Sequence, residues 1–110
     1  MKTPSKAQRL RIYIDEADRW QGRPLYQAVV EAAREEGLAG ATVLKGLFGF
    51  GAKSRLNSGK HLRLEENPPI VIEIVDSEEK VGLFLKRLDE FVREGFVTLD
   101  DVQMVSYRTQ

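Results

Sequence analysis

The sequence predicts an α+β fold of the ferredoxin-like type. Its βαββαβ order gives a four-stranded antiparallel sheet with two helices on one face and a long loop between strands two and three. Three observations support this prediction. Apolar and polar residues alternate over residues 9–14, a β-branched run fills residues 70–75, and residues 24–36 and 77–94 carry apolar side chains at helical spacing.

The first half of the chain contains clear signals for where each element begins and ends. A polar lead over residues 1–7, which we expect to be flexible, precedes the first strand. Pro24 suits the first turn of the first helix, and Gly37 supplies a left-handed stop after it. Residues 40–45 are predicted as the second strand, because their centre is β-branched.

The second half begins with the longest stretch without periodicity. This loop starts at Leu47 and ends at Asn67, and loops of such length are usually functional. After the third strand, Asp76 is expected to cap the second helix with Glu79 in a capping box, and Gly95 to end it. The rest is predicted as an extended piece over residues 96–99, a turn at Asp100 and Asp101, and a fourth strand over residues 102–107.

One face of the predicted sheet lacks a cover. If Ile70, Ile72 and Ile74 face the helices, Val71 and Val75 must point the other way, because successive strand residues alternate. An apolar second face in so short a chain favours self-association. A few scattered surface valines remain the alternative interpretation.

The composition excludes several classes of protein. The chain has 110 residues, which predicts a single domain over residues 1–110, with 17 basic and 17 acidic side chains and no cysteine. The lack of cysteine excludes thiol catalysis and thiolate metal sites, and it is typical of a cytoplasmic protein. Zero net charge argues against general nucleic-acid binding. No apolar run approaches the roughly 20 residues of a membrane span, so membrane insertion is not expected.

No set of residues with catalytic chemistry emerges, so we expect a protein that is not an enzyme. His61 has no second histidine or cysteine with which to share a metal. Residues 46–54 contain the two glycines of a phosphate loop, but the lysine falls one position late and no helical pattern follows. The acidic residues Asp15, Glu16 and Asp18 leave a carboxylate metal site as an alternative.

The balanced charge is unevenly distributed along the chain. Residues 37–64 contain no acidic residue, and they carry five of the basic ones, Lys45, Lys53, Arg55, Lys60 and Arg63. The rest of the chain therefore holds 12 basic and 17 acidic side chains. Positive charge concentrated around one loop favours an anionic ligand or an acidic surface on a partner, with a merely solvated loop as the alternative.

Several segments together resemble the PII signal-transduction superfamily. They are a Gly-x-Thr-Val strand at residues 40–43, a Gly-Phe-Gly turn at residues 49–51 and a proline-initiated strand of valine and isoleucine at residues 69–76. With Gly-Arg-Pro-Leu-Tyr at residues 22–26 and Gly-Phe-Val-Thr at residues 95–98, the chain more closely resembles the PII-like family called domain of unknown function 190. The resemblance covers nearly the whole chain.

This resemblance implies a homotrimer with a small-ligand cleft between subunits. By motif position it assigns ligand binding to Thr42, Gly49, Gly51, Lys53, Arg55 and Arg108. Residues 95–101 lack the Gly-Asp-Gly-Lys phosphate loop of nucleotide-binding PII proteins. The expected ligand is therefore left open between a smaller adenine nucleotide and another anionic metabolite.

The same resemblance implies a regulatory role. Residues 47–67 are expected to dock on a regulated transporter or enzyme in a manner that the bound ligand changes. The alternative is a divalent-metal-binding or metal-tolerance trimer of related architecture, which would use the acidic residues that follow the first strand.

Overall fold

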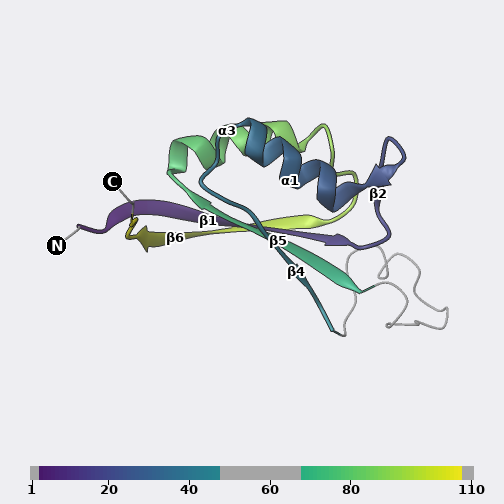
Figure 1. Cartoon of the computed structure of the whole chain (residues 1–110), viewed down its shortest axis with the longest axis horizontal. Coiled ribbons are helices and arrows are strands. Elements are labelled where there is room, and N and C mark those ends of the chain that lie inside the picture. Colours follow the sequence, from purple (N-terminus) through teal and green to yellow (C-terminus); the bar gives the residue numbers. More distant parts are fainter. Residues whose placement is uncertain (1–2, 48–67, 108–110) are drawn as a thin grey trace.

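The computed structural model describes residues 3–47 and 68–107, and it confirms the ferredoxin-like α+β fold (Figure 1). Its antiparallel sheet has the strand order β4 (Thr42–Lys45), β5 (Pro69–Asp76), β1 (Ser5–Asp15) and β6 (Phe96–Met104). Helices α1 (Leu25–Glu35) and α3 (Glu78–Leu88) lie on one face of this sheet. β1 begins at Ser5, within the stretch that the sequence assigns to the polar lead.

The core fills the space between the sheet and the helices. β1 pairs with β5 so that Leu10 lies opposite Ile74 and Ile12 opposite Ile72, and all four side chains are buried. The helices bury one apolar stripe each against these strands, made of Leu25, Ala28, Val29, Ala32 and Ala33 on α1 and of Val81, Phe84 and Leu88 on α3. The alternation predicted for the first and third strands is therefore confirmed.

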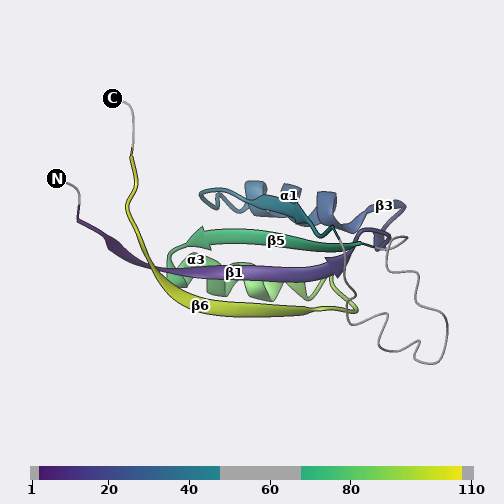
Figure 2. The same ribbon diagram turned by 90° about the horizontal axis from the view of Figure 1, so that it is seen from below.

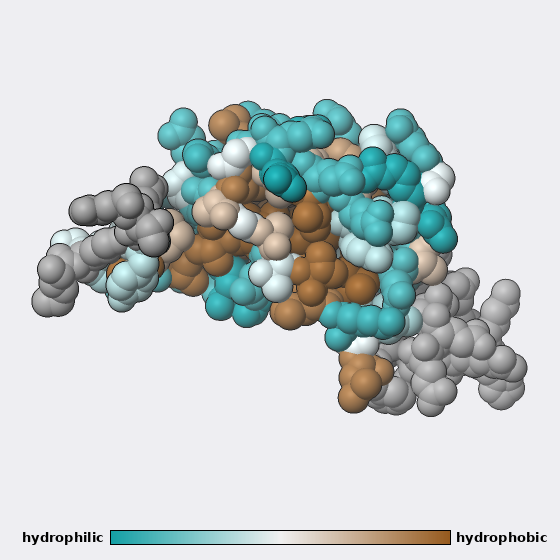
Figure 3. All heavy atoms as spheres, in the orientation of Figure 1, coloured by the Kyte–Doolittle hydropathy of each residue, from teal (hydrophilic) through white to brown (hydrophobic). Residues whose placement is uncertain are grey.

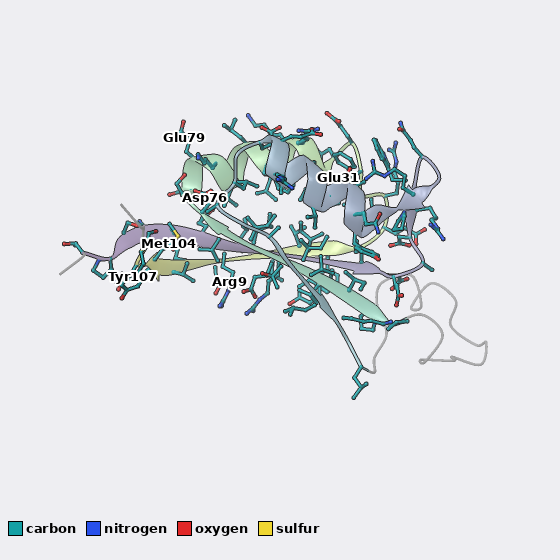
Figure 4. The ribbon with its side chains drawn as sticks, in the orientation of Figure 1. Arg9, Glu31, Asp76, Glu79, Met104 and Tyr107 are labelled. Carbon is teal, nitrogen blue, oxygen red and sulfur yellow. The ribbon has the colours of Figure 1, made fainter. Side chains whose placement is uncertain are left out.

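The start of α3 differs from the prediction. Ser77 is the N-cap, and its hydroxyl accepts a hydrogen bond from the Lys80 backbone N–H at 3.2 Å. The buried carboxylate of Asp76 instead accepts the backbone N–H groups of Ala39 and Ser77, at 2.8 and 2.7 Å (Figure 4). Asp76 thus ties the chain before β4 to the start of α3, and Glu79 is an exposed acidic residue of the first turn.

The predicted end of α3 is also wrong. The helix ends at Leu88, and Phe91 continues the apolar pattern from a turn, where it is buried. Gly95 has a φ of 138° and approaches β1 so closely that a Cβ there would lie 2.5 Å from the carbonyl oxygen of Tyr13. Only glycine accommodates this approach.

β6 is one continuous strand, so the turn predicted at Asp100 and Asp101 is wrong. β1 supplies a partner for each carboxylate. Arg9 Nε donates to Asp100 Oδ1 at 3.2 Å, and Gln8 Nε2 donates to Asp101 Oδ1 at 3.5 Å. Cross-strand pairs of this kind stabilise acidic residues within a sheet.

Between β1 and α1 the structure contains an element that the sequence does not predict. β2 (Arg19–Trp20) and β3 (Arg23–Pro24) form a hairpin closed by Gln21 and Gly22, with φ values of 49° and 79°. Positive φ at both central residues is typical of a type I′ turn. Strands of two residues are too short to show any alternation in the sequence.

The other side of the sheet is seen in Figure 2, with both helices behind it. We call it the open face and define it by Arg9, Arg11, Tyr13, Val71, Glu73, Val75, Phe96 and Asp100. Arg11 Nε lies 3.0 Å from Glu73 Oε2, and the stacked rings of Tyr13 and Phe96 have centroids 4.6 Å apart. Figure 4 shows Arg9 on the side away from the helices. Val71 and Val75 are half-buried on this face, as predicted.

Both edge strands expose hydrophobic side chains. These are Val43 and Leu44 on β4, and Phe96, Val97 and Leu99 on β6. In Figure 3, hydrophobic surface gathers below α1 on the β4 side, whereas the outer surfaces of the helices are largely hydrophilic. None of the helices within the described ranges has the length and apolar character needed to cross a membrane.

Candidate functional site

Backbone hydrogen bonds hold together the end of the sheet where β4 stops and β5 starts. Gly46 N–H donates to the carbonyl oxygen of Pro69 at 2.7 Å, and Glu16 N–H donates to that of Pro68 at 3.2 Å. A Cβ at Gly46 would lie 2.5 Å from Pro69 Cγ, so this close approach requires glycine. The ends of β1, β4 and β5 therefore form one fixed cluster.

The turn that follows β1 is also fixed. Asp18 N–H donates to the carbonyl oxygen of Asp15 at 3.1 Å, and the Asp18 carboxylate accepts the Asp15 N–H at 3.0 Å. From this turn Glu16 reaches across to β4, where its Oε2 lies 3.1 Å from Lys45 Nζ. Both side chains of this ion pair are substantially exposed, so it contributes no more than about 1 kcal/mol to stability. The pair does place a positive and a negative side chain next to each other at this end of the sheet.

A pocket of about 590 Å³ opens at this end of the molecule. Its described lining comes from the turn after β1, from β2, from the end of β4 and from the residue before β5, and consists of Glu16, Ala17, Arg19, Lys45, Gly46, Leu47 and Pro68. The lining carries two cations, one carboxylate and a glycine backbone. The two cationic side chains are groups that bind a small anion, whereas the Gly46 N–H is already donated to Pro69.

One of the predicted ligand-binding residues, Thr42, belongs to the described part of the chain. It is exposed on β4, opposite Glu73 of the open face, and it does not line the pocket. The other predicted residues lie outside the described ranges: Gly49, Gly51, Lys53, Arg55 and Arg108.

The sequence does not indicate that Arg19 and Lys45 line one pocket. β4 and β1 are separated by β5 in the sheet, so no pairing pattern links these residues. Their ends are brought together by the backbone hydrogen bonds to Pro68 and Pro69 and by the turn after β1. The sequence signal was a basic residue at the end of a strand and another in a turn region, which many surface segments share.

The acidic residues after β1 have partners of their own. Asp15 and Asp18 are joined within the turn, and Glu16 pairs with Lys45. Among residues 3–47 and 68–107, no group of three or more His, Cys, Asp or Glu side chains is arranged to hold a metal ion. This turn therefore gives no support to the alternative of a carboxylate metal site.

Comparison with known protein families identifies the family to which the chain belongs. Residues 7–104 match the family DUF190, described as "Uncharacterized ACR, COG1993". This chain belongs to the DUF190 family. A "UPF0166 protein" of Aquifex aeolicus is 36% identical over 100 residues, covering 91% of this chain and 94% of the relative. Another, of Methanocaldococcus jannaschii, is 33% identical over 105 residues, covering 94% of this chain and 96% of the relative.

Solved structures place this DUF190 chain in the PII-like fold. CPII from Thiomonas intermedia, bound to ADP, AMP and acetate, superposes with a TM-score of 0.66 at 22% identity, covering 94% of this chain and 93% of that one. A PII-like signalling protein from Thermus thermophilus superposes with a TM-score of 0.64 at 20% identity, covering 93% of this chain and 92% of that one. At these identities the likeness establishes the fold.

Proposed function

We propose that this protein is a PII-like regulator without catalytic activity of its own. It assembles as a homotrimer, binds a small anionic ligand at a subunit interface, and controls a transporter or enzyme through residues 47–67. An adenine nucleotide is the leading ligand. The observation that carries the proposal is the 590 Å³ pocket at the base of that segment, because Arg19 and Lys45 give it a cationic lining.

The open face and the sheet edges support self-association. The open face combines half-buried valines with polar groups that already pair within the subunit, such as Arg11 with Glu73. Buried charges are tolerated when they are paired and hydrogen-bonded, so this face is suited to burial against another copy. The edge strands β4 and β6 add exposed hydrophobic side chains beside unpaired backbone, which proteins normally cover.

The choice of an adenine nucleotide rests on the shared fold. CPII, which has the same fold, is described in complexes with ADP, AMP and acetate and with ADP and bicarbonate. The pocket volume falls within the range of roughly 300–1,000 Å³ that is typical of small-molecule sites. Both the nucleotide and a small oxyanion are therefore ligands to test.

The experiment is calorimetric titration of the purified protein with ADP, AMP, ATP and bicarbonate, combined with amide hydrogen exchange of residues 47–67. We expect binding of at least one nucleotide below millimolar concentration and a change in exchange of that segment. Lys53→Ala and Arg55→Ala should weaken binding while leaving the assembly intact, and Lys86→Ala, on the exposed side of α3, is the matched control. If no nucleotide or anion binds below millimolar concentration and exchange stays unchanged, the proposal is wrong.

A further inference from the structure

The β2–β3 hairpin is anchored beside the end of α3 through its tryptophan. Trp20 Nε1 donates a hydrogen bond to the carbonyl oxygen of Glu90 at 3.2 Å. Its ring packs against Phe91 with centroids 4.6 Å apart, and Phe91 itself is buried in the core. A half-buried indole that packs against a buried phenyl ring and donates its N–H fixes both the position and the orientation of the hairpin.

The hairpin is tied to α1 as well. Arg23 forms an ion pair with Glu31 on that helix, which Figure 4 shows on its outer side. At the base of the hairpin, Leu25 N–H donates to the carbonyl oxygen of Asp18 at 2.8 Å. With these attachments on two sides, the hairpin is a fixed arm rather than a freely moving turn, and Arg19 is carried on that arm.

Arg19 lies between two hollows of the surface. One is the 590 Å³ pocket, where the other lining cation, Lys45, is paired with Glu16. The second is a smaller hollow of about 190 Å³ with the described lining Asp18, Arg19, Leu25, Phe91, Arg93 and Glu94. Apart from the shared Arg19, the described lining of the smaller hollow has two carboxylates and one cation, so it does not favour an anion.

The larger pocket has an unbalanced positive charge. Its described lining contains two cations and one carboxylate, and the carboxylate is 3.1 Å from Lys45. Arg19 has no ion pair with any residue in the described ranges. A guanidinium held on a fixed arm, beside a pocket and without a described carboxylate partner, is available to a ligand.

We infer that Arg19 binds the oxyanion of the ligand in the 590 Å³ pocket, whether that oxyanion is the phosphate of a nucleotide or a free phosphate or carboxylate. This inference rests on the proposed function. The planar guanidinium presents two parallel N–H donors that match two oxygens of a phosphate or carboxylate. Since the contacts of Trp20 fix the backbone of the hairpin, binding of the oxyanion orders the Arg19 side chain without also having to order the strand that carries it.

The test is a calorimetric titration of the intact protein with ADP, with adenosine and with inorganic phosphate. Arg19→Gln removes the charge and the guanidinium fork, Arg19→Lys keeps the charge but loses the fork, and Arg93→Gln removes an arginine that lines the smaller hollow alone. We expect Arg19→Gln to weaken ADP binding by at least about tenfold, with Arg19→Lys intermediate. Arg93→Gln should stay within about twofold of the parent protein.

The three ligands separate the possible sources of the oxyanion and the possible failures. Adenosine should bind the parent and Arg19→Gln equally, because it carries no oxyanion. If ADP binds the parent and Arg19→Gln with equal affinity, the inference about Arg19 is overturned while the proposed function stands. If phosphate binding depends on Arg19 and no nucleotide binds, the inference stands and the nucleotide is replaced by a free oxyanion. If none of the three binds the parent protein, the inference about Arg19 is overturned, and the proposed function is overturned with it only if AMP, ATP and bicarbonate also fail to bind.

Discussion

On β1, residues that face the helices and residues that face away alternate along one strand, yet their surroundings differ sharply. Leu10 and Ile12 are fully buried among aliphatic side chains. Arg9, Arg11 and Tyr13 sit on the open face, where each has a partner on a neighbouring strand, Asp100, Glu73 or Phe96. The covered face gains stability mainly from apolar burial, whereas the open face pairs its polar groups with each other and leaves valines between them.

This difference separates the two roles of the sheet. The covered face determines whether the single chain folds, because it holds the core. The open face contributes less to the fold of one chain, and we propose that it determines assembly. Substitutions on the two faces should therefore change different measured quantities, the free energy of unfolding for the covered face and the mass of the assembly for the open face.

Phe84→Ala tests the covered face. Phe84 is buried at the centre of α3 against the sheet, so its truncation leaves a cavity and should lower the free energy of unfolding by about 3–5 kcal/mol. Urea unfolding followed by circular dichroism, at a fixed protein concentration, measures this. Its neighbour Leu83 is 58% exposed, and Leu83→Ala should cost less than about 1 kcal/mol. Equal effects of the two variants would contradict the assignment of the core.

Val71→Asp tests the open face. A carboxylate placed among half-buried side chains there cannot be buried against a second copy without a large desolvation penalty. We expect the mass by analytical ultracentrifugation to fall from trimer to monomer at micromolar concentration, with a folded circular dichroism spectrum. Leu83→Asp adds the same charge on the exposed side of α3 and should leave the mass unchanged. A Val71→Asp variant that remains trimeric would remove the argument that this face assembles the protein.

Asp76→Ala tests the charged group at the boundary between the sheet and the helix layer. The change leaves the backbone N–H groups of Ala39 and Ser77 without their acceptor and should cost about 2 kcal/mol in unfolding free energy. Asp76→Asn keeps an acceptor oxygen and should cost less. Glu79→Gln should stay within about 0.5 kcal/mol, because Glu79 is exposed. A larger effect at Glu79 than at Asp76 would favour the capping box that the sequence predicts.

The Arg9 and Asp100 pair gives the smallest effect. The hydrogen bond from Arg9 lowers the pKa of the Asp100 carboxyl below its ordinary value of 3.8. Because the pKa is lower in the folded state, the stabilising contribution is present above that ordinary value and is lost as the pH falls through the lowered pKa. An NMR titration should show the depressed pKa, and Arg9→Gln should return it toward the ordinary value. Arg23→Gln, which removes an arginine from the hairpin, should not change it.

Much of the fold was predictable because its central strands alternate cleanly. Leu10, Ile12 and Ile14 on β1, and the matching isoleucines of β5, show in sequence which side is covered. The sequence predicts the wrong local structure where contacts with residues far away in the chain outweigh the local preference of a residue type. Asp100 is a residue type that favours turns, but in the structure it lies within β6, where its carboxylate accepts a hydrogen bond from Arg9 on β1. Phe91 continues the apolar spacing of a helix in the sequence, but it lies in a turn beyond the end of α3 and is buried in the core from there.

The candidate site was less predictable than the fold. Its described lining joins Glu16, Arg19 and Lys45, which come from separate elements and follow no common spacing. The hairpin that positions Arg19 depends on Gln21 adopting a positive φ, which few residues other than glycine do and which sequence propensity disfavours. The motif-based residues Lys53 and Arg55 remain predictions.

The central position of β1 also has a consequence for the order in which the fold can form. β1 pairs with β5 and with β6, and the hydrogen bond from Ser5 to Met104 joins residues 99 positions apart. Such pairings carry a large loop-closure cost, and chains dominated by them fold slowly for their size. During synthesis β1 has no strand partner until β5 and β6, which come late in the chain, have been made. Arg9 and Arg11 alternate with its apolar side chains and keep the unpaired segment charged, which opposes its aggregation.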